Sequence, residues 1–187
     1  MAVIGLKNFY VAQIISDDEN GTVYGTPRKI DKAMNISITP NTNSATLYGD
    51  DQAQEIVEEL ESVDVEISTN DLSLEDYAFL LGKEVNEDGG VIDSANDEAP
   101  YVAFGYEMPL SKGGKQLTWL YKGKFGIPSE SGQTKQGSPE FQTPTISATF
   151  IPRSSDGKWR YRIRTNETNQ SIIDNWFNEV QEYPHTP

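Results

Sequence analysis

The chain has 187 residues, of which 36% are hydrophobic and none is cysteine; this predicts one domain with a modest core and excludes disulfides, thiol catalysis and cysteine metal sites. No apolar run approaches the roughly 20 residues of a membrane-spanning helix, and the opening residues lack a signal-peptide pattern, so we expect no membrane association. The net charge of −14 argues against a protein whose task is to grip DNA.

The charge is unevenly distributed along the chain. Residues 50–98 contain 17 acidic residues and one basic residue, a net of −16, whereas residues 101–164 contain ten basic and four acidic residues, a net of +6. Charged surfaces of this kind are usually solvated. The segregation also fits an assembly in which the acidic part of one copy, including Asp50 and Asp51, contacts the basic part of the next.

Strand patterns dominate the first third of the chain. Residues 6–15 and 35–40 predict strands, and the turn sequence DDENG follows the first of them. Residues 38–59 are long and polar, and we expect an extended loop or arm there. In residues 62–68, three apolar side chains alternate with three polar ones. This strand would bury Val63, Val65 and Ile67 and expose Asp64, Glu66 and Ser68.

One helix is predicted over residues 73–81. Ser73 and Asp76 have the spacing of a capping box, in which a side-chain oxygen accepts a hydrogen bond from a free backbone N–H group. The following apolar residues recur at helical spacing, and Gly82 can end the helix. The members of this apolar stripe are Leu74, Tyr77, Ala78 and Leu81.

Strands return in the second half of the chain. Residues 101–108 and 117–125 are aromatic-rich and flank a turn that contains Gly113 and Gly114. Residues 145–150 alternate between apolar and polar side chains, and the turn at 154–157 predicts a hairpin from Phe150 to Trp159. The next strand would place Trp159, Tyr161 and Ile163 on one face and Arg160, Arg162 and Arg164 on the other.

Residues 127–144 form a polar, proline-punctuated connection that is far longer than a hairpin turn needs. It is either a surface loop or an arm that leaves its own domain and packs on another copy. The prolines favour the arm, because they reduce the entropy that ordering costs. Its candidate contact residues are Gln133, Thr134, Lys135 and Phe141.

The whole pattern predicts a mainly-β protein. We expect about eight antiparallel strands in a β-sandwich or barrel, with one packed α-helix and extended loops or arms. This domain would span residues 1–165. Residues 166–187 would be a C-terminal appendage that can form a short helix.

Patterns that indicate catalysis are missing from the sequence. The one histidine, His185, lies three residues from the C-terminus, where chain ends usually fray. An acidic stretch from Glu84 resembles a calcium loop, but Ala95 stands where such a loop needs a bidentate glutamate. We therefore expect no enzyme activity, no cofactor and no metal site.

Five phrases resemble a known family. They are LYGDDQAQE (47–55), YVAFGY (101–106), WLYKGKF (119–125), EFQTPTISATFI (140–151) and DGKW (156–159). In this order and spacing they resemble the major tail protein, or tail tube protein, of long non-contractile-tailed bacteriophages (siphophages) of Gram-positive bacteria. The resemblance covers roughly residues 5–165.

The resemblance implies a structural virion protein. Proteins of this family are β-sandwiches with a flanking helix; six copies form a ring whose inner sheets line a lumen, and rings stack into the tube that delivers DNA. It implies that the chain assembles in the host cytoplasm and resides in the phage tail. Its partners would be further copies, the tape measure protein, the tail terminator and the baseplate or distal tail proteins. DNA would only pass through, without specific binding.

Within such a tube, residues of this chain acquire expected roles. Asp64 and Glu66 are candidates for the lumen, where carboxylates would repel DNA phosphates. The three arginines at 160, 162 and 164, together with Asp50 and Asp51, are candidates for contacts between subunits. The 127–144 segment is the candidate for contacts between rings.

A second class of function remains open. A β-sandwich without catalytic groups could be a carbohydrate-binding or adhesin module of a virion or cell surface. Its sugar platform would then consist of exposed aromatic rings, for which the candidates are Trp119, Tyr121, Trp159 and Tyr161.

Overall fold

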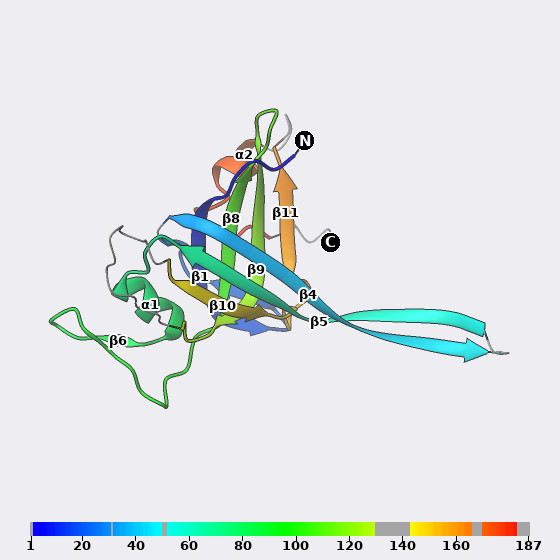
Figure 1. Ribbon diagram of the computed structural model, residues 1–187, viewed down its shortest axis with the longest axis horizontal. Coiled ribbons are helices and arrows are strands. Elements are labelled where there is room, and N and C mark those ends of the chain that lie inside the picture. The colour runs from blue at the N-terminus through cyan, green and yellow to red at the C-terminus, as the bar shows by residue number, and fades with distance from the viewer. Residues whose placement is uncertain (1, 31, 50–51, 130–142, 166–169, 183–187) are drawn as a thin grey trace, which may run out of the picture.

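The computed structural model describes residues 2–30, 32–49, 52–129, 143–165 and 170–182 (Figure 1). Within these ranges the chain forms eleven strands and two short helices. The strands are β1 (Lys7–Asp18), β2 (Gly21–Tyr24), β3 (Arg28–Ile30), β4 (Ala33–Gly49), β5 (Gln52–Thr69), β6 (Glu84–Val85), β7 (Val91–Ile92), β8 (Val102–Pro109), β9 (Lys115–Phe125), β10 (Thr145–Phe150) and β11 (Arg160–Arg164). The helices are α1 (Leu74–Leu81) and α2 (Gln170–Asp174).

Nine strands form one antiparallel sheet. Its order is β2-β1-β8-β9-β10-β5-β4, with β3 paired to β1 and β11 paired to β9, while β6 and β7 form a separate pair. The predicted mainly-β, antiparallel fold with a packed helix is confirmed. The sheet does not close into a barrel, because β2 and β4 end the order without pairing to each other.

The sheet bends at β9 into two layers. The first half of β9 pairs with β11 and its last residues, Gly123 to Phe125, pair with β10. Consequently β10, β5 and β4 cross over the layer formed by β1, β8 and β9 (Figure 1). Gly123 permits this crossing, since a Cβ atom there would lie 2.5 Å from the Phe150 ring.

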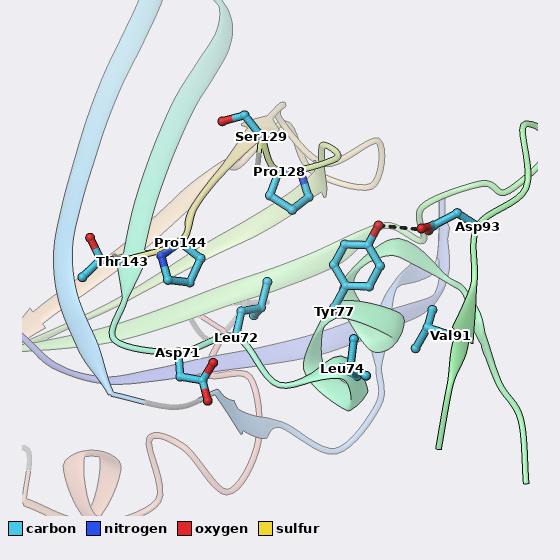
Figure 2. A pocket seen from close by; sticks show the side chains of 10 residues that line it. All are labelled: Asp71, Leu72, Leu74, Tyr77, Val91, Asp93, Pro128, Ser129, Thr143 and Pro144. Carbon is cyan, nitrogen blue, oxygen red and sulfur yellow. Dashed lines mark hydrogen bonds between the residues drawn. The ribbon is translucent and has the colours of Figure 1, made fainter. Parts of the chain in front are cut away.

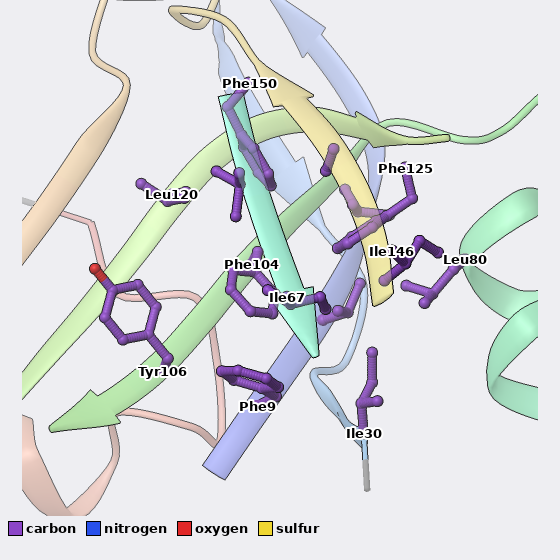
Figure 3. Packing of buried hydrophobic residues seen from close by; sticks show 14 of the residues in the cluster. Phe9, Ile30, Ile67, Leu80, Phe104, Tyr106, Leu120, Phe125, Ile146 and Phe150 are labelled. Atoms are coloured by element: carbon purple, nitrogen blue, oxygen red, sulfur yellow. The ribbon is translucent and has the colours of Figure 1, made fainter. Parts of the chain in front are cut away.

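The main core lies between the two layers (Figure 3). The predicted alternation holds in β10 and in the inner part of β5, where every second side chain from Val63 to Thr69 is buried. From the other layer, Phe9, Phe104 and Phe125 pack into the same space, and the Phe104 ring lies 5.1–6.4 Å from the rings of Phe9, Phe125 and Phe150.

A second core covers the opposite face of β1, β8 and β9. Ile173, Trp176 and Val180 from the C-terminal segment pack there against Trp119 and Tyr121. Trp119 Nε1 donates a hydrogen bond to the Trp176 carbonyl oxygen at 3.0 Å. Residues 170–182, expected as part of a C-terminal appendage with a short helix, contain the helix α2 and pack on this face of the sheet.

Helix α1 agrees with its prediction. The Ser73 side chain accepts a hydrogen bond from the Asp76 backbone N–H group at 3.1 Å, as a capping box requires. Gly82 ends the helix in the left-handed region, at φ 65°. Leu80 is fully buried in the main core and was not in the predicted stripe, whereas Leu74 of that stripe is exposed.

Two predicted segments take other forms. Residues 38–59, expected as an extended loop or arm, lie in the long β4–β5 hairpin, whose pairing runs to Gly49 and Gln52 and whose outer part projects from the domain as an arm (Figure 1). Polar residues can form this ribbon because the strands satisfy each other's backbone groups. The expected hairpin from Phe150 to Trp159 is also absent from the described strands, since β10 and β11 both pair with β9.

Candidate assembly surfaces

The β4–β5 hairpin is the most prominent surface feature. Its two strands continue beyond the body of the domain as a two-stranded ribbon (Figure 1). On this ribbon Ile56 and Val57 are 65% and 48% exposed. The main core receives hairpin side chains only as far out as Leu60. The hairpin beyond that point therefore has no packed layer within the described protein. Asp50 and Asp51 lie outside the described residues.

Two further strands have an unpaired side. Among the described strands, β4 pairs only with β5, and β11 pairs only with β9. Unpaired strand edges present free backbone donors and acceptors that can pair with another chain. Pro40 lies within β4 and cannot donate a hydrogen bond. These two edges belong to different layers of the folded sheet.

The outer face of the β4–β5–β10 layer is polar throughout its centre. Asp64 and Glu66 are exposed there, as predicted, and lie between small hydroxyl residues of the two flanking strands. Asp64 accepts hydrogen bonds from Asn41 Nδ2 at 2.8 Å and from Thr149 Oγ1 at 3.1 Å. The hydroxyl neighbours of the two carboxylates are Ser37, Thr39, Ser147 and Thr149.

The arginine row of β11, which we define as Arg160, Arg162 and Arg164, lies on one face of that strand. Arg164 Nε donates to Gln116 Oε1 at 2.9 Å. The Arg160 guanidinium lies 4.1 Å from the centre of the Trp159 ring. Burial and the neighbouring Arg162 lower the pKa of Arg160. In the described part of the chain, neither Arg160 nor Arg162 forms an ion pair with a carboxylate.

Trp159 does not join the predicted aromatic face of β11. It precedes the strand and packs against the main core, whereas Tyr161 and Ile163 pack against the second core. Trp119 and Tyr121 are fully buried. The four aromatic residues therefore do not form a shared exposed platform for a sugar.

Arg153 is a buried charge that sequence analysis missed. It is 5% exposed and forms ion pairs with Asp156, at 2.5 Å, and with Glu182 of the C-terminal segment. It also donates to the Tyr24 hydroxyl at 3.2 Å and lies over the Tyr121 ring. Burial alone would raise the pKa of Asp156, but hydrogen bonds from Arg153 and Lys158 lower it to about 2. A single arginine in a turn gives no periodic signal.

Asp17 joins β1 to the 154–155 turn. Its carboxylate accepts hydrogen bonds from Lys122 Nζ at 2.6 Å, Thr22 Oγ1 at 2.8 Å and the Ser154 backbone N–H at 2.9 Å. Burial would raise the pKa of Asp17, but these hydrogen bonds outweigh it and hold the pKa well below its usual range. Asp17 and Arg153 are structural charges.

A pocket of about 420 Å³ lies beside α1 (Figure 2). Its walls combine apolar side chains with the carboxylates of Asp71 and Asp93. Asp93 accepts hydrogen bonds from the Tyr77 hydroxyl at 2.9 Å and forms an ion pair with Lys83 at 2.7 Å. The apolar and small lining residues are Leu72, Leu74, Tyr77, Val91, Pro128, Ser129, Thr143 and Pro144.

The remaining predicted contacts cannot be placed. Gln133, Thr134, Lys135 and Phe141 fall outside the described residues. Within the described ranges, no three histidine or acidic side chains gather in a way that could hold a metal ion. Neither described helix has the length and apolarity that crossing a membrane requires. No known family model matches the chain, and a search of curated proteins found no significant match.

Proposed function

We propose that the protein is a structural subunit that assembles with copies of itself into stacked hexameric rings, forming the tail tube of a siphophage. The β4–β5 hairpin carries this proposal. A two-stranded ribbon is marginally stable by itself in water, and this one exposes Ile56 and Val57. A neighbouring subunit would bury those side chains and give the ribbon a packed layer.

The charges at the β4 and β11 edges support a head-to-tail ring. The strand beside the β4 edge carries Glu58, Glu59 and Glu61, and the β11 edge carries the arginine row. Opposite charges on two different surfaces favour a heterologous contact, in which the β4 side of one copy meets the β11 side of the next. Such a contact forms a closed ring when the rotation between neighbouring copies brings the last copy back to the first.

The polar face around Asp64 and Glu66 would line the lumen. Its centre offers small hydroxyl groups and carboxylates. Lys124 of β9 lies opposite Thr149 at the border of this face and forms an ion pair with Glu98 at 3.4 Å. Phosphates are repelled by carboxylates and bound by lysine and arginine. DNA could then pass along this face without adhering. The tape measure protein, the tail terminator and the baseplate or distal tail proteins would be the other partners.

Self-assembly of the purified protein tests the proposal. Sedimentation velocity across a range of concentrations should show large species that grow with concentration, and negative-stain electron microscopy of the same samples should show hollow tubes or rings. A single monomer boundary at every concentration, with empty fields under the microscope, would contradict a tube protein and would favour a monomeric binding module.

A further inference from the structure

The β8–β9 turn and the lobe formed by residues 71–98 carry opposite charge. The turn connects Pro109 to Lys115, and exposed Lys112 lies at the tip. Residues 71–98 contain nine acidic residues and one basic residue. This acidic lobe, which holds α1, β6 and β7, lies across the domain from the β8–β9 turn (Figure 1).

The basic end also presents an ordered apolar side chain. Ile4 is 67% exposed. Its backbone is nevertheless held in place, because the Ile4 N–H donates to the Pro109 carbonyl and the Ser111 N–H donates to the Ala2 carbonyl, both at 2.9 Å. Because the backbone at Ile4 is already ordered, binding this side chain would cost little further conformational entropy. Ile4 lies beside the turn that carries Lys112.

The acidic end presents a pocket lined by apolar side chains together with Asp71 and Asp93. Leu74, at its wall, is 57% exposed although it is a large aliphatic side chain. The Lys83 ion pairs with Asp93 and Asp97, at 2.7 and 2.9 Å, fix the loop that carries one wall. Figure 2 shows Leu74 and Tyr77 of α1 on one side of the pocket, and Pro128 and Pro144 across it.

We propose that this pocket receives Ile4 of a second copy, with the basic turn of that copy lying against the acidic lobe. The inference rests on the proposed tube and would supply the contact between successive rings. Each copy has the pocket at one end and Ile4 at the other, so the contact joins two different surfaces and is heterologous. Every added copy then leaves a free surface for the next one, and the result is a filament. The complementary charges would fix the direction of stacking.

Cysteine cross-linking tests this contact directly, because the chain contains no cysteine. The full-length Ile4→Cys, Leu74→Cys variant is oxidised at a concentration where the wild type assembles, and is then separated on a denaturing gel without reductant. We expect a ladder of covalent dimers, trimers and larger species. The matched control is Ile15→Cys, Leu74→Cys, since Ile15 is equally exposed, at 70%, but lies on β1 away from the basic turn. The control should run mainly as monomer.

The outcomes separate this contact from the tube itself. Wild-type tubes without a ladder would overturn the contact and leave the tube proposal standing. A ladder without tubes would support the contact and overturn the tube. Neither ladder nor tubes would overturn both. A second measurement avoids cysteine: Ile4→Asp should reduce the sedimenting fraction about tenfold, whereas Ile15→Asp should not. Equal assembly of these two variants would also overturn the contact.

Discussion

Arg153 ties the C-terminal segment to the domain through its ion pair with Glu182. Its guanidinium joins the 153–158 turn, β2 and Glu182 in one buried network. Removing one partner from a buried ion pair leaves the other charge without compensation, which costs about 3 kcal/mol or more. Arg153→Met should therefore lower the free energy of unfolding by about 3 kcal/mol in urea denaturation. Lys112→Met, at an exposed site, should change it by less than about 0.5 kcal/mol.

Fluorescence gives a separate reading of the same variant. Trp176 belongs to the C-terminal segment and is fully buried against the sheet, so loosening of that segment should shift tryptophan emission to longer wavelength before the sheet unfolds. A variant with wild-type stability and unshifted emission would show that apolar packing alone holds the segment.

Asp17 should make stability depend on pH. Its folded-state pKa is held below the usual range, so the carboxylate contributes stability that is fully present above its ordinary pKa of about 3.9 and is lost as the pH falls below it. Asp17→Asn should lower the free energy of unfolding by about 1–3 kcal/mol at pH 7. The difference from wild type should shrink below about pH 4.

Unfolding measured at pH 7, 5 and 3 checks this prediction. Asp18→Asn is the neighbouring control, since that side chain is exposed and should show little difference from wild type at any of the three pH values. A constant gap between Asp17→Asn and wild type across the series would mean that the hydrogen bonds of Asp17 do not require its charge.

At the residue scale, sequence analysis predicted periodic features and missed isolated ones. Asp64 and Glu66 were predicted to be exposed because successive side chains of a strand point to opposite faces of the sheet. Asp17 and Lys122 were missed because they lie 105 residues apart in the chain. Arg153 was missed because its partners Tyr24 and Glu182 are distant in the sequence, although Asp156 is close. Such pairs become visible only when the strands have been assembled in three dimensions.

At the element scale, the distal β4–β5 hairpin should be dispensable for folding and required for assembly. Asn43 pairs directly with Glu59, so residues 44–58 can be replaced by an Asn-Gly turn that closes a two-residue hairpin. Because the main core receives no side chain from the removed part, the thermal midpoint should stay within a few degrees of wild type. Sedimentation should show only monomers or small oligomers.

A full-length variant localises the effect. Ile56→Asp, Val57→Asp keeps the ribbon but makes both of its faces polar at this position, and it should weaken assembly to a similar degree. Long tubes from the shortened protein would show that the hairpin is not an assembly element.

Elements with strong periodicity were predicted well. The helix near residue 74 and the strands of the main core follow from capping and alternation, which are local properties. Residues 38–59 were predicted as an extended loop or arm, but their strand pairing was not predicted because the segment is polar. Two exposed strands can still satisfy each other's backbone groups without a buried face. The role of residues 170–182 was missed because their partner surface comes from three distant strands.

For the whole molecule, charge should govern assembly. If the arginine row meets carboxylates of a neighbouring copy, Arg160→Glu, Arg162→Glu should reduce the assembled fraction about tenfold or more, since like charges would then face each other. Wild-type assembly should also weaken as salt rises from about 0.05 to 0.5 M. Lys29→Glu, Lys32→Glu makes the same change in net charge away from β11 and serves as the control. An equal loss of assembly in both variants would indicate an effect of the net charge and not of a contact made by the arginine row.

The orientation of the subunit in the assembly tests the central claim most directly. A cryo-electron microscopy reconstruction of the assembled protein should show stacked rings of six copies around a hollow lumen. The β4–β5–β10 face, with Asp64 and Glu66, should line that lumen, and the β4–β5 hairpin should pack on a neighbouring copy. An assembly without a lumen, or one with Asp64 and Glu66 on its outer surface, would contradict the account.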